Sequence, residues 1–163
     1  MCNVEKRYAR ITLWFFVIVL GLDLGAGLYE TRVVVPLWAN GAPATLAEGN
    51  PYAQVAINAG VHFWAYLSSA VGIAAVAALA FGLRTPPPAL SWRIVAVVLE
   101  LCSVAATLLY FRPTLIHLFI GHGAGLSDAL IRTTIQRWVA LNWIRLAVRF
   151  CAWCAALGAL AIS

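Results

Sequence analysis

The chain has 163 residues, of which 63% are hydrophobic and only 10% carry a formal charge. In soluble domains about a quarter of all residues are charged, so this composition excludes an ordinary water-soluble domain. The net charge of +5 does not indicate nucleic-acid binding, because the cations are scattered along the chain and form no basic stripe.

Four long apolar runs dominate the chain. They cover residues 11–37, 56–83, 92–112 and 137–162. Each run is near or above the roughly 20 residues that a helix needs to cross a bilayer. Only helices and closed barrels satisfy their backbone in lipid, and these runs are too long for barrel strands. The sequence therefore predicts an all-α fold, a four-transmembrane-helix bundle with a polar interior, as one domain over residues 1–163.

Positive charges gather before the first run and around the second connection. These residues are Lys6, Arg7, Arg10, Arg84 and Arg93. The first connection, at residues 38–55, contains no lysine or arginine. Because positive residues favour the cytoplasmic side, we expect an integral, multi-pass protein of a bacterial inner membrane, with both termini in the cytoplasm.

Each of the first three runs carries polar residues at spacings that put them on one helix face. These residues are Asp23 and Glu30 in the first run, Asn58, His62, Tyr66 and Ser69 in the second, and Glu100, Ser103, Thr107 and Tyr110 in the third. Ionisable side chains inside a membrane segment are costly and mark function by default. We therefore expect these faces to point into the bundle.

The fourth run has the most informative polar face. Trp138, Asn142, Arg145 and Arg149 follow one another at steps of four and three residues, so they share one side of a helix. Each arginine costs roughly 2.5–3.5 kcal/mol at the centre of a membrane helix on insertion scales. Both arginines must therefore face the protein interior and find partners there.

Counting inwards at 1.5 Å per residue puts the ionisable residues at two depths. The inner layer contains Asp23, Glu100 and Arg149, and the outer layer contains Glu30, His62 and Arg145. The inner layer is predicted to be a structural ion-pair layer. The outer layer combines an acid, a titratable imidazole and a fixed cation, which is a set suited to catalysis.

In the outer layer, His62 or Glu30 is a candidate general base. Arg145 and Asn142 are candidates to stabilise an oxyanion as it develops. Aromatic residues at similar depth are candidates to line a substrate site, namely Tyr66, Tyr110, Trp138 and Trp143. The alternative interpretation is structural: the same polar residues would only hold the bundle together.

A metal centre is a further alternative, with Glu30, His62, His117 and His122 as its ligands. No two of these residues have a strong ligand spacing, such as histidines four residues apart on one helix. The preferred interpretation therefore has no metal, and the cofactor stays unknown.

Three stretches together resemble one family. They are residues 27–38, residues 110–115 and residues 137–145. The first ends a glycine-rich helix in valines and proline, the second has a proline-threonine step, and the third has a Trp-x-x-x-Asn-x-x-Arg signature formed by Trp138, Asn142 and Arg145. The chain is similar to the small four-helix membrane proteins that include the fungal and bacterial anthrone oxygenases.

This resemblance implies that an activated aromatic methylene is oxidised to a carbonyl by O₂ without an added organic cofactor. Three classes of function stay open. They are a membrane oxygenase acting on a hydrophobic small molecule, a non-catalytic bundle that binds a small molecule or lipid, and a structural subunit of a membrane complex or homo-oligomer.

Overall fold

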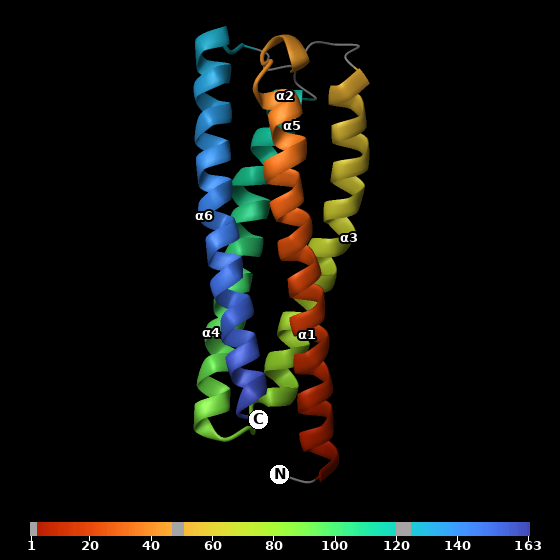
Figure 1. Ribbon diagram of the computed structural model, residues 1–163, viewed down its shortest axis with the longest axis vertical. Helices are drawn as coiled ribbons and strands as arrows, with labels where there is room; N and C mark the ends of the chain where they lie inside the picture. The colour runs from red at the N-terminus through yellow and green to blue at the C-terminus, as the bar shows by residue number, and fades with distance from the viewer. Residues whose placement is uncertain (1–2, 47–50, 120–124) are drawn as a thin grey trace.

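The computed structural model describes residues 3–46, 51–119 and 125–163, with the backbone alone for residues 3, 51–59 and 61. Four long helical rods run through the described residues. Figure 1 shows the rods side by side, with both termini at one end of the molecule. The described residues contain helices and no strand. The predicted all-α four-helix bundle is therefore confirmed.

Within the described ranges, four segments are long and apolar enough to cross a membrane. They are Val4–Ala39, His62–Gly82, Pro87–Phe119 and Asp128–Ala161. Large apolar side chains such as Leu22, Ile73 and Leu109 are exposed on the outside of the bundle. An apolar exterior of this extent suits lipid rather than water, so the protein is a multi-pass membrane protein.

The first rod changes its helical geometry near the end of the bundle that lies opposite the termini. It consists of α1 (Asn3–Tyr29), the π-helical segment η1 (Glu30–Val34) and α2 (Val35–Ala39). Pro36 explains the change, because proline has no N–H and its ring clashes with the carbonyl four residues back, here that of Arg32 in η1. In η1 the N–H of Val35 bonds instead to the carbonyl of Glu30, a wider turn that accommodates the proline.

The third rod repeats this arrangement. It consists of α4 (Pro87–Ala106), the π-helical segment η3 (Thr107–Phe111) and α5 (Arg112–Phe119). The proline is now Pro113, and the carbonyl four residues back belongs to Leu109 in η3. The N–H of Arg112 bonds to the carbonyl of Thr107. Each π-helical segment thus ends two residues before a proline within a membrane helix.

The second and fourth rods are α3 (Pro51–Gly82) and α6 (Asp128–Ala161), and a short helical turn, η2 (Ala44–Leu46), follows α2. Ser127 caps α6, since its side chain accepts a hydrogen bond of 3.4 Å from the N–H of Leu130. The helices begin earlier than the apolar runs predicted, as α6 starts nine residues before position 137. Apolar composition marks the part in lipid, whereas backbone hydrogen bonding continues through polar turns.

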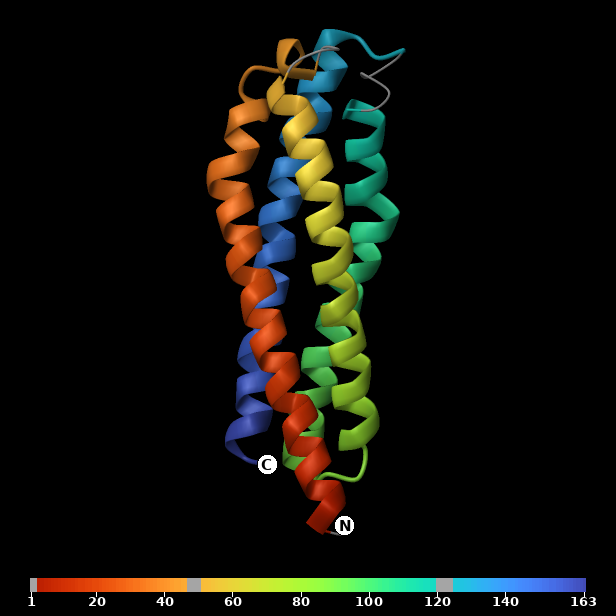
Figure 2. The same ribbon diagram turned by 90° about the vertical axis from the view of Figure 1, so that its right-hand side faces the viewer.

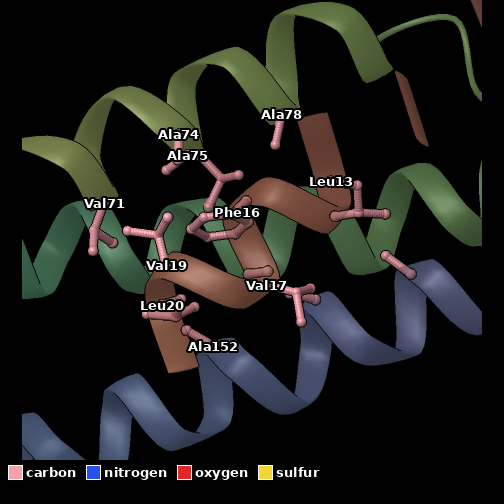
Figure 3. Close-up of a cluster of buried hydrophobic side chains, with 14 of the residues drawn as sticks. Leu13, Phe16, Val17, Val19, Leu20, Val71, Ala74, Ala75, Ala78 and Ala152 are labelled. Carbon is pink, nitrogen blue, oxygen red and sulfur yellow. The ribbon is translucent and has the colours of Figure 1, made fainter. Parts of the chain in front are cut away.

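The rods are held together by two apolar clusters, one at each end of the bundle. The cluster at the end with the termini is shown in Figure 3 and includes Phe16, Leu20, Val71 and Ala152 from α1, α3 and α6. Many of its members are alanines, whose small side chains let membrane helices approach closely. Figure 2 shows α1 running beside α3 in this part of the molecule.

The opposite cluster is aromatic. Trp38 of α2 packs edge-to-face on Trp138 of α6 and on Phe119 of α5, and Phe111 packs edge-to-face on Trp138. Offset and edge-to-face packing is the arrangement that aromatic rings prefer. The two clusters leave a section between them in which the buried side chains are mostly polar.

A buried arginine joins three helices near the end with the termini. Arg93 of α4 is fully buried, and its Nη1 donates to the carbonyls of Ala78 (2.9 Å) and Ala9 (3.3 Å). Because Gly82 has no side chain, the guanidinium of Arg93 can occupy the space next to it. A Cβ atom built at Gly82 would collide with Nη1, Cδ and Cζ of Arg93.

We predict that Gly82→Ala lowers the free energy of unfolding by about 1–3 kcal/mol, because the added methyl displaces a well-packed buried group and breaks its hydrogen bonds. Denaturant-induced unfolding in detergent measures this loss. Gly25→Ala is the matched control, since a Cβ atom at Gly25 meets nothing within 4 Å. Equal stability of the two variants would contradict the packing role of Gly82.

Candidate functional site

The deepest polar group is built around Arg149 of α6. Its Nη1 lies 2.5 Å from Oδ2 of Asp23 on α1, its Nη2 lies 3.5 Å from Oε1 of Glu100 on α4, and its Nε donates to Oγ of Ser103 at 2.7 Å. The three ionisable side chains are at most 1% exposed. One guanidinium therefore joins three of the four rods through two carboxyl groups.

Arg145 lies one turn before Arg149 on α6, further from the end with the termini, and makes a different set of contacts. Its Nη1 donates to Oγ1 of Thr107 at 3.0 Å, and its Cζ lies 4.3 Å from the centre of the Phe111 ring. A guanidinium over an aromatic ring is stabilised by the cation–π interaction. The Nε of Arg145 is buried and has no hydrogen-bond partner among the described residues, so it is a donor available to a ligand.

Asn142 occupies the next turn of the same helix face. Its Nδ2 donates to Oγ1 of Thr31 at 2.6 Å, and that hydroxyl donates to the carbonyl of Gly27 at 2.7 Å. The amide oxygen of Asn142 is buried and has no hydrogen-bond partner among the described residues. Asn142 thus combines a satisfied donor with a free acceptor.

The polar face of α6 contacts both π-helical segments. Asn142 bonds to Thr31 in η1, while Arg145 contacts Thr107 and Phe111 in η3. Trp138 adds a hydrogen bond of 3.2 Å from its Nε1 to the carbonyl of Phe111. π-Helical turns inside α-helices are frequent at functional sites. The Trp-x-x-x-Asn-x-x-Arg signature is therefore the point at which the fourth rod meets the π-helical segments of the first and third rods.

Glu30 is the carboxyl group at the same depth in the bundle as Arg145. It begins η1 and is partly buried, and its Oε1 accepts a hydrogen bond of 2.8 Å from Nε1 of Trp64 on α3. Sequence reasoning did not single out Trp64. The signal for it was an apolar stripe on α3, since Trp64, Leu67, Val71 and Ala78 recur at helical spacing and the last two are fully buried.

The polar residues of the second run lie elsewhere than expected. His62 is exposed, and Tyr66 is 77% exposed on the outside of α3. The apolar stripe of α3 packs against the other helices. The polar face of α3, which lies on the other side of the helix, therefore points to the exterior. The structure therefore does not bring His62 next to Glu30 and Arg145. The side chain of Asn58 lies outside the described residues.

The predicted aromatic lining is divided by the fold. Trp138 is 2% exposed and Tyr110 is partly buried, whereas Trp143 is 41% exposed on the outer face of α6. Trp138 also packs inside the aromatic cluster at the end of the bundle opposite the termini. Of the four predicted aromatic residues, Trp138 and Tyr110 are thus the two that are at least partly buried, and Tyr110 packs against the cluster that contains Trp138.

Three of the four alternative metal ligands lie in the described residues, and the structure does not bring these three together. His117 and His62 are exposed, and His122 lies outside the described residues. Within the described ranges, no group of three or more histidine, cysteine, aspartate or glutamate side chains could hold a metal ion. The polar side chains that are buried in the described residues carry carboxyl, amide, hydroxyl and guanidinium groups.

A groove of about 430 Å³ lies on the outside of α3 and α4 and is almost entirely apolar. It is lined by Gly72, Ile73, Val76, Ala77 and Leu101. None of the buried polar residues contributes to it, so the groove is not part of the candidate site.

Comparison of the chain with protein-family models, with curated proteins and with solved structures found no match.

The hydrogen bond between Asn142 and Thr31 ties α6 to η1. We predict that Thr31→Val lowers the free energy of unfolding by about 1 kcal/mol, because it leaves a buried amide donor without its acceptor. Denaturant-induced unfolding in detergent measures the change. The matched control is Thr133→Val on the exposed face of α6, where the hydroxyl bonds only within its own helix. An equal effect in both variants would show that the buried bond adds nothing.

Proposed function

We propose that this protein is a membrane-embedded oxidoreductase that oxidises an activated methylene group of a hydrophobic small molecule to a carbonyl with O₂. The site is formed by Glu30 and Arg145 of the outer layer together with Asn142, and His62 is not part of it. The observation that carries the proposal is the meeting of the signature face of α6 with both π-helical segments. The resemblance of the sequence to the anthrone oxygenase family supports the same reaction class.

The contacts suit three separate roles. Glu30 is the base that removes a proton from the substrate methylene, because it is the carboxyl group at the level of Arg145 and is held by Trp64. The free Nε of Arg145 donates to the oxygen of the enolate as negative charge develops there. The free amide oxygen of Asn142 accepts a hydrogen bond from a substrate hydroxyl group.

The reaction balances without a further redox partner. Removal of one proton gives an enolate, which adds O₂ at carbon and takes up a proton to form a hydroperoxide. Loss of water from this hydroperoxide breaks the O–O bond and leaves the carbonyl. The sum is one methylene and one O₂ converted into one carbonyl and one water.

We expect Glu30→Gln to lower turnover about 10²–10⁴-fold, which is the usual contribution of a general base. Arg145→Gln should lower it about 10²–10³-fold by removing a donor to the enolate oxygen. The measurement is O₂ uptake by purified protein with an anthrone, together with the absorbance of the quinone product. Chromatographic profiles of the variants verify that they remain folded.

Two exposed residues provide matched controls, Asp128→Asn for the acid and Arg132→Gln for the arginine. His62→Ala separates the two candidate bases. Loss of turnover in His62→Ala but not in Glu30→Gln would overturn the role given to Glu30. Absence of turnover in the unaltered protein, with anthrone binding retained, would favour a non-catalytic binding bundle, and absence of both would favour a structural subunit.

We also propose that the termini face the cytoplasm of a bacterial inner membrane. The end with the termini carries exposed Lys6, Arg7, Arg10 and Arg84, and Arg84 is paired with Glu5 across the helix ends at 2.5 Å. Positive residues favour this side. A carboxyl-terminal green fluorescent protein fusion should therefore fluoresce in cells, and an alkaline phosphatase fusion at the same position should be inactive. The reverse pattern would refute this orientation.

A further inference from the structure

The buried polar section contains more carboxyl groups than guanidinium groups. The carboxyl groups are those of Asp23, Glu30 and Glu100, and the guanidinium groups are those of Arg145 and Arg149. Arg145 is at the level of Glu30, which leaves Arg149 to face two carboxyl groups. If both were ionised, this inner layer would carry a net negative charge in the centre of the membrane. An uncompensated charge is strongly disfavoured there.

No other described cation supplies the balance. Arg93 is the next buried cation on α4, but it lies seven residues from Glu100, about 10 Å along the helix. Its Nη1 is bonded to backbone carbonyls at the end with the termini. The fully buried apolar residues Ala96 and Val97 lie between Arg93 and Glu100 in the chain.

The geometry separates the two carboxyl groups of the layer. Asp23 is 2.5 Å from Arg149, the distance of a close ion pair, whereas Glu100 is 3.5 Å away. Both side chains are fully buried, and their oxygens have no hydrogen-bond partner among the described residues beyond these contacts with Arg149. Glu100 thus has only the more distant contact with the guanidinium to replace the water around an ionised carboxylate, whereas Asp23 has the close ion pair.

We propose that the inner layer is an intramembrane proton-binding site, in which Asp23 and Glu100 hold one dissociable proton over Arg149 and the proton is on Glu100. Two carboxyl groups around one cation then carry no net charge. This is the behaviour expected of carboxyl groups that share a site, since ionising both is disfavoured.

The surroundings favour a proton over a metal cation. Oε1 of Glu100 is 3.5 Å from the guanidinium of Arg149, so a sodium ion at this oxygen would lie beside a fixed positive charge. A proton bonds covalently to the oxygen and removes the negative charge directly. The charged groups that face Glu100 most closely are Asp23 from α1 and Arg149 from α6, with Arg145 one turn further along α6 at the level of Glu30. The described buried face of α3 presents apolar groups such as Leu67 and Val71.

Infrared spectroscopy of the protein in lipid nanodiscs tests the site directly. A protonated buried carboxyl group gives a C=O band above the amide I band, and this band should be present in the unaltered protein in neutral buffer. Incorporation of ¹³C-carboxyl glutamate should shift the band, whereas labelled aspartate should not. A band that responds to aspartate, or the absence of any band, would overturn the assignment.

Two variants locate the proton among the glutamates. Glu100→Gln should remove the band, and Glu30→Gln should retain it, because Glu30 belongs to the outer layer. Loss of the band in Glu30→Gln would overturn the location. Replacing choline with sodium in the buffer should leave the band unchanged, and its loss in sodium would show that a metal cation displaces the proton.

Stability measurements give a second, independent readout. Glu100→Gln and Asp23→Asn should each unfold within about 3 °C of the unaltered protein, because in either variant one carboxylate remains to pair with Arg149. The double variant leaves Arg149 unpaired and should lower the unfolding temperature by roughly 10 °C. If each single variant lowered it as much as the double variant, both carboxylates would be required as ions, and the proposal would fail. These outcomes do not depend on whether the protein oxidises a substrate.

Discussion

The fold depends on the cost of placing a guanidinium in the middle of a membrane. Arg149 cannot remain there without partners, and it obtains them from Asp23 on α1 and from Glu100 and Ser103 on α4. Three rods are thereby fixed in register at one depth. Apolar clusters pack at each end of the bundle, but van der Waals packing between lipid-like side chains is weakly directional. The ionic layer supplies the specificity that such packing lacks.

Two prolines link the backbone to the polar layers. Pro36 and Pro113 each follow a π-helical segment, and those segments carry the side chains that receive Asn142 and Arg145. The wider turns rotate the outer parts of the first and third rods relative to their inner parts. As a result, the outer layer differs from the inner one in chemistry: Arg149 is surrounded by carboxyl groups, whereas Arg145 is held by a hydroxyl group and an aromatic ring and keeps a free N–H.

The two layers therefore suit different roles within one interior. The inner layer is fully enclosed and joins the rods through ionic contacts, so proton binding is the chemistry that it supports. The outer layer has a partly buried acid from the first rod and a free donor and a free acceptor from the fourth, which is what recognition of an oxygenated, otherwise hydrophobic molecule requires. Ser103 and Thr107 lie one turn apart on the third rod and contact the two arginines in turn.

The sequence alone determined the class of fold and the membership of the inner layer, because membrane helices need long apolar runs and their buried charges need partners at equal depth. It also determined which face of α6 points inwards, since Asn142, Arg145 and Arg149 share that face. Only the tertiary structure decided the rotation of α3. Its polar face, with His62 and Tyr66, competes with an apolar stripe that contains Trp64 and Val71, and the stripe packs inwards because Trp64 bonds to Glu30. Helical periodicity identifies both faces of such a helix, but contacts with the neighbouring rods decide which of them is buried.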